Sequence, residues 1–133
     1  MGSLIRLNWM EPGLLSVSGT NGRYLVNPEG APVFLVGGKY WLAGQDGGRD
    51  NPPAAFDWDT YLALGVTKGW NLVPFYLWEH AWHQSASDDW YIAPMPFARP
   101  GPGNALDGNP KFDLTTFNST YFDRLRARII EAG

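Results

Sequence analysis

The chain has 133 residues, of which 44% are hydrophobic and 17% charged, with a net charge of -3 and no cysteine. This length suits one ordinary domain but falls short of the roughly 250 residues of a closed eight-stranded α/β barrel. The charge argues against a nucleic-acid partner, the missing cysteines exclude disulfides and thiolate metal sites, and no apolar run approaches the roughly 20 residues of a membrane-spanning helix.

The first part of the sequence predicts a lead-in and a small flap. Residues 1–13 show no clear period and are expected to form a flexible lead-in. Residues 15–18 and 23–26 are β-prone pieces with turn residues after each, which predicts a small β-hairpin flap. Arg6 has no apolar stretch of secretory length after it, so no signal peptide is predicted, and a secreted or periplasmic parent would carry its leader elsewhere.

The middle of the chain predicts a β-α-β unit. Residues 33–36 are a continuous apolar run, as expected for a parallel strand covered on both faces. A helix is expected over 57–68, with Gly69 as its stop, followed by a second buried strand over 72–77. Pro74 cannot donate to a ladder, so this second strand is expected to be irregular.

The last third predicts a long loop and a final helix. Residues 79–117 show no periodic element, and the aromatic side chains in this stretch favour an ordered loop. Asn118 is a good N-cap for a helix in which Phe122, Leu125 and Ile129 recur at helical spacing. A helix at the end of an alternating β-α pattern predicts that a strand would follow.

Aromatic and ionisable side chains gather at the ends of the two expected strands. The chain holds seven Trp, six Tyr and seven Phe, which suits either a carbohydrate-active protein, where flat rings stack on sugars, or a large aromatic core. The candidate substrate-binding residues are Lys39, Trp41, Trp78, Glu79, His80, Trp82 and His83. Each tryptophan among them could serve as a sugar platform or as part of the core.

Glu79 has three interpretations: a substrate contact, a structural residue, or one of the two carboxyl groups that glycosidases require. With His80 and His83 it also suggests a metal site. The order Glu-His-x-x-His matches neither helical zinc motif, and a loop would spoil the i, i+4 geometry, so no metal is expected. No cofactor is expected either, because phosphate-binding glycine motifs and a G-x-S-x-G elbow are absent from the sequence.

Several segments together resemble the cellulase-like and apiosidase-like group of (β/α)8 glycoside hydrolases. The matching segments are 21–24 with Gly30, the first expected strand through Trp41, residues 45–48, residues 78–79, and the run 99–114 with the helix that follows. The resemblance covers about residues 14–133. Lys39 stands where that family usually has a histidine, and Pro74 stands where an arginine often lies.

This resemblance implies an α/β fold class, namely an incomplete (β/α)8 TIM barrel with two βα units after the flap, within a single truncated domain. It implies a glycoside hydrolase fragment that supplies the substrate-binding rim for a polysaccharide or oligosaccharide, with the catalytic glutamates beyond the chain end. Two rivals remain open: a non-catalytic carbohydrate-binding module, and a gene fragment without independent function. The sequence does not decide the sugar or the oligomeric state.

Overall fold

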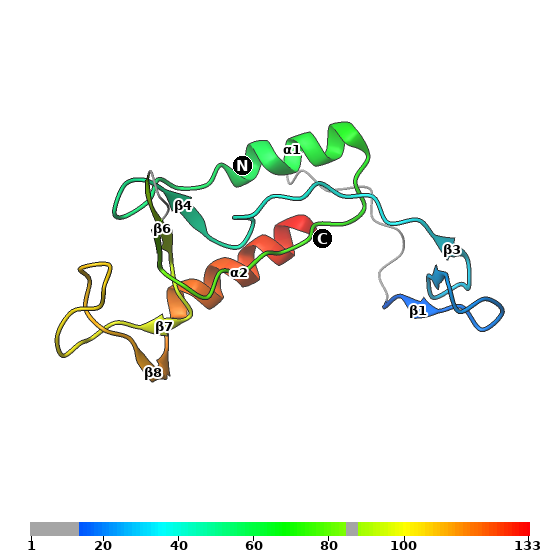
Figure 1. Cartoon of the computed structure of the whole chain (residues 1–133). Coiled ribbons are helices and arrows are strands. Elements are labelled where there is room, and N and C mark those ends of the chain that lie inside the picture. Colours follow the sequence, from blue (N-terminus) through cyan, green and yellow to red (C-terminus); the bar gives the residue numbers. More distant parts are fainter. Residues whose placement is uncertain (1–13, 85–87) are drawn as a thin grey trace. The chain divides into compact units, whose positions relative to one another are not determined.

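The structure is a computed structural model that describes residues 14–84 and 88–133, so the expected lead-in at 1–13 lies outside the described residues. The chain divides into two compact units. Of the described residues, the first contains 14–39, 59–74 and 131–133, and the second contains 40–58, 75–84 and 88–130. The described residues form two helices and three small antiparallel sheets (Figure 1).

The flap belongs to the first unit. It comprises β1 (Ser16–Val17), β2 (Leu25–Val26) and β3 (Pro32–Val33), paired antiparallel in that order. Asn27 shapes the turn between β2 and β3, because its side-chain oxygen accepts the Ala31 N–H at 2.8 Å. Gly30 completes this turn with a φ of 81°, a conformation that glycine adopts at little cost. The predicted hairpin flap is therefore confirmed and gains a third strand.

Helix α1 (Trp58–Lys68) confirms the first predicted helix. Its residues Tyr61 and Leu62 are buried, and the Tyr61 hydroxyl donates to the Gly38 carbonyl at 2.7 Å. Burial raises the pKa of this hydroxyl. The helix ends as predicted at Gly69, which has a φ of 66°, and the N–H of Trp70 returns to the Gly65 carbonyl at 2.9 Å.

The two parallel strands predicted around α1 do not form. The residues 34–39 and 69–81 contain no strand, and Phe34, expected to be covered on both faces, is 85% exposed. Asn71 explains the result. Its side-chain oxygen accepts the Val36 N–H at 2.7 Å and its amide donates to the Phe34 carbonyl at 3.0 Å, so it occupies the backbone groups that a neighbouring strand would use.

The prediction of an incomplete (β/α)8 TIM barrel is therefore wrong. All strand pairs in the described residues are antiparallel, whereas a barrel of βα units needs parallel ones. Pro74 contributes to the failure because it has no N–H for a ladder. The segment that contains it lies against 34–39 only locally, where the N–H groups of Asn71 and Leu72 both donate to the Val36 carbonyl.

The second unit contains a sheet in a stretch where a long loop was predicted. Strands β4 (Asp46–Gly48), β6 (Asp89–Ala93) and β5 (Trp82–Gln84) pair antiparallel in that order. A second hairpin, β7 (Phe97–Ala98) with β8 (Asp113–Phe117), follows (Figure 1). The prediction of a loop over 79–117 is therefore wrong, because strands of two to five residues are too short to show a period.

Helix α2 (Ser119–Ala132) confirms the second predicted helix. It follows β8 directly (Figure 1), and the side-chain oxygen of Asn118 accepts the Thr120 N–H at 3.2 Å as the predicted N-cap. The buried Asp46 of β4 fixes the helix through an ion pair with Arg124 at 2.5 Å. Arg128 is buried as well and donates to the Ala43 carbonyl at 2.8 Å. Neither helix in the described part of the chain is long and apolar enough to cross a membrane.

Candidate functional site

Four of the predicted substrate-binding residues lie in a continuous row within the second unit. The ring centroids of Trp41 and Trp78 are 6.0 Å apart, those of Trp78 and His80 are 5.1 Å apart, and those of His80 and His83 are 5.8 Å apart. The rings are tilted or perpendicular to each other, as aromatic pairs prefer. We call these four residues the aromatic row.

The aromatic row is open to solvent at both ends and anchored in the middle. Trp41 is 59% exposed, and both histidines are exposed. Trp78 is half-buried and packs against the small core of Leu42, Ile92 and Met95. The row therefore combines an exposed indole with two exposed imidazoles, whose nitrogens can donate or accept hydrogen bonds.

A fully buried glutamine fixes the position of Trp78. The Gln45 amide donates to the carbonyls of Trp78 and Pro94 at 3.2 and 3.0 Å, and its oxygen accepts the Trp78 N–H at 2.6 Å. The Trp78 indole in turn donates to the Trp41 carbonyl at 2.7 Å. Both the backbone and the ring of Trp78 are thus held in place before any ligand binds.

The register of β5 and β6 decides on which face of the sheet the neighbouring tryptophans lie. His83 pairs with Trp90, which is 39% exposed, so these two side chains lie on the same face of the sheet. Trp82 pairs with Tyr91, and alternation along each strand places this pair on the opposite face. Trp90 therefore lies on the same sheet face as His83, and Trp82 lies on the face away from it.

Two further predicted residues are Glu79 and Lys39. Glu79 stands between Trp78 and His80 in the sequence, and its side chain is exposed. Lys39 belongs to the other compact unit. Among residues 14–84 and 88–133, no group of three or more histidine, aspartate or glutamate side chains is placed to hold a metal ion.

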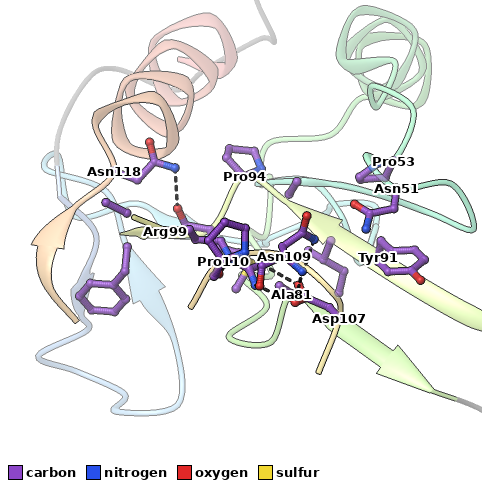
Figure 2. A pocket seen from close by; sticks show the side chains of 15 residues that line it. Asn51, Pro53, Ala81, Tyr91, Pro94, Arg99, Asp107, Asn109, Pro110 and Asn118 are labelled. Carbon is purple, nitrogen blue, oxygen red and sulfur yellow. Dashed lines mark hydrogen bonds and ion pairs between the residues drawn. The ribbon is translucent and has the colours of Figure 1, made fainter. Parts of the chain in front are cut away.

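The second unit also contains a pocket of about 480 Å³ (Figure 2). This volume lies in the range of roughly 300–1,000 Å³ that small-molecule sites occupy. Its walls combine apolar side chains with amide side chains and a single pair of opposite charges. The lining includes Asn51, Tyr91, Met95, Phe97, Arg99 and Asp107.

The charged pair closes the loop between β7 and β8. Arg99 donates two hydrogen bonds to the carboxylate of Asp107, at 2.6 and 2.7 Å, and a third to the Pro110 carbonyl at 2.6 Å. The side chains of Arg99 and Asp107 are only 19% and 4% exposed. The hydrogen bond from Arg99 lowers the pKa of Asp107 below its ordinary value, so the carboxylate stays ionised and paired.

Sequence reasoning missed Gln45, Tyr91 and the pair of Arg99 with Asp107. Gln45 stands in a stretch rich in glycine and aspartate that reads as a solvated loop, so its burial left no signal. The pair could have been suspected, because an arginine and an aspartate eight residues apart flank tight Pro-Gly turns. Asn118 was identified only as a helix cap, yet it also lines the pocket and donates to the Met95 carbonyl at 2.9 Å (Figure 2).

Comparisons with protein-family models, with curated proteins and with solved structures found no match for this chain.

Proposed function

We propose that this chain binds a carbohydrate, a polysaccharide or oligosaccharide, through the aromatic row. The observation that carries the proposal is the uninterrupted sequence of four rings at centroid spacings of 5.1 to 6.0 Å, with its terminal ring, Trp41, 59% exposed. An extended ligand with apolar faces and many hydroxyl groups matches such a surface, because it can stack on rings and bond to imidazoles.

Preorganisation supports the proposal. The bonds from Gln45 and the indole bond to the Trp41 carbonyl fix Trp78 in the free protein, so binding would not have to order that ring. Ordering a long side chain at an interface costs roughly 0.5–1.5 kcal/mol, and this cost is avoided at the centre of the row.

The test is isothermal titration of the chain with soluble neutral glucans, xylans, mannans and their oligosaccharides. We expect at least one of them to bind, and Trp41→Ala to lower its affinity at least about tenfold, or 1.4 kcal/mol. The Trp78 bond survives this change because the Trp41 acceptor is a backbone carbonyl. The matched control is Tyr24→Ala, which removes a 55% exposed aromatic ring from the other unit and should leave affinity unchanged.

Two results would overturn the proposal: a wild-type chain that binds none of these glycans, or a Trp41→Ala variant that binds as well as the wild type. A reducing-sugar assay separates binding from hydrolysis. Glycosidases need two carboxyl groups flanking the scissile bond, and we propose binding without turnover by this chain. Sugar release that disappears in Glu79→Gln would instead assign a catalytic role to that residue.

A further inference from the structure

The pocket of the second unit has no role in the proposed function. The lining of the pocket includes none of the four rings of the aromatic row, although Ile92 and Met95 line it and also belong to the core against which Trp78 packs. A ligand in the pocket and a ligand on the row would therefore occupy different places. The pocket has a chemistry of its own.

The first clue to its ligand is charge. Arg99 and Asp107 are the ionisable pair in the lining, and they neutralise each other through two short hydrogen bonds. Arg99 also donates to the Pro110 carbonyl, so its donors are largely used within the protein. A charged ligand would lose its hydration without finding an opposite charge, which is costly. The lining therefore favours a neutral ligand.

The second clue is the mixture of apolar and polar groups. Ile92, Pro94, Met95 and Phe97 supply apolar wall. The Asn51 amide, which can both donate and accept, makes no hydrogen bond to another described residue, and it is drawn at the same side of the pocket as Tyr91 in Figure 2. A lining that combines an apolar surface with a group that can both donate and accept hydrogen bonds suits a molecule with one apolar face and several hydroxyl groups.

We propose that this pocket is a second binding site, for a neutral, hydroxyl-rich small molecule of about the size of a monosaccharide. The apolar wall covers one face of the molecule, and Asn51 exchanges hydrogen bonds with its hydroxyl groups. The ion pair of Arg99 with Asp107 keeps the wall of the pocket in place without attracting ions. This site does not depend on ligand binding at the aromatic row.

The test is ligand-observed NMR of the intact chain with neutral monosaccharides (glucose, galactose, xylose, mannose), each compared with glucuronate and glucosamine. We expect a neutral sugar to bind with a dissociation constant on the order of 1 mM, and the charged analogues to bind more weakly. Asn51→Ala should weaken binding at least about fivefold, as expected for the loss of one hydrogen-bonding group. Asn104→Ala removes an exposed asparagine that does not line the pocket, and it should have no effect.

Trp41→Ala separates this proposal from the previous one, because it should weaken binding of the polysaccharide or oligosaccharide at least about tenfold while leaving the monosaccharide signal intact. The pocket proposal is overturned if no neutral monosaccharide binds, if charged analogues bind equally well, or if Asn51→Ala binds like the wild type. Loss of the monosaccharide signal in Trp41→Ala would also overturn it, since both ligands would then share the row. Because Asn51 is exposed, its substitution should not prevent folding.

Discussion

The substitution Gln45→Met tests whether one buried amide holds the candidate site together. Methionine keeps nearly the same length and volume but makes none of the three hydrogen bonds that Gln45 forms with the backbone of Trp78 and Pro94. One N–H and two carbonyl groups would be left unpaired around a side chain that is 0% exposed. Each such group costs about 1–3 kcal/mol, so the sum starts at about 3 kcal/mol.

We expect Gln45→Met to lower the free energy of unfolding by about 3 kcal/mol, because small shifts and water entry should keep the loss near the lower end of that sum. The measurement is urea unfolding followed by tryptophan fluorescence. The matched control is Gln84→Met, the same change at an exposed position of β5, which should stay within about 0.5 kcal/mol of wild type. If both variants have the same free energy of unfolding as the wild type, the role assigned to Gln45 is refuted.

A second variant at the same position adds a pH dependence with a definite sign. Gln45→Glu keeps the acceptor for the Trp78 N–H but faces the Trp78 and Pro94 carbonyls with a carboxylate at neutral pH. Burial beside these oxygens should raise the folded-state pKa of the new carboxyl above its unfolded value of about 4.3. Stability should therefore increase as pH falls through the raised folded pKa, when a protonated carboxyl can donate again. A variant equally stable at pH 7 and pH 5 would contradict this account.

Two further predictions concern the ion pair of Arg99 with Asp107 and the packing of Gly37 against Leu72. The hydrogen bond from Arg99 holds the pKa of Asp107 below its ordinary 3.8, so the stability that this carboxylate contributes is present above that value and is lost as pH falls through the folded pKa. Urea unfolding at several pH values should show an acid-side loss of stability in the wild type that Asp107→Asn lacks. An Asp107→Asn variant that loses as much stability in acid as the wild type would contradict this role. At Gly37 an added methyl group would overlap the Leu72 carbonyl, so Gly37→Ala should lower stability by more than about 1 kcal/mol in thermal unfolding. The control is Gly19→Ala, which has open space around it and should change the melting curve little. Equal melting curves for the two variants would count against the close contact at Gly37.

The sequence predicted those parts of the fold that depend on local signals. The helices at 58–68 and 119–132 were readable from helical spacing together with a stop or a cap, Gly69 and Asn118. The buried face of the second helix was not, because the expected positions Phe122 and Ile129 are 40% and 53% exposed. The expected strands at 33–36 and 72–77 carry apolar runs that look the same in a parallel sheet and in extended chain.

The candidate site was predictable by residue type but not by arrangement. Aromatic and histidine side chains around residue 80 suggested a binding surface, and the structure places four of them in one row. Their order depends on the pairing of β5 with β6, whose short strands show no readable period. The role of Gln45 could not be predicted, because its hydrogen-bond partners lie more than thirty residues away along the chain and leave no signal in the residues around it.

The bonds that Gln45 makes to oxygen and nitrogen all involve main-chain atoms of its partners. The support of the row is therefore largely independent of which rings stand on it. Substitutions at Trp41, His80 or His83 can alter the shape and polarity of the surface while the backbone beneath keeps its position. A small library of substitutions at these three exposed positions should therefore change ligand preference while leaving the stability of the chain nearly unchanged.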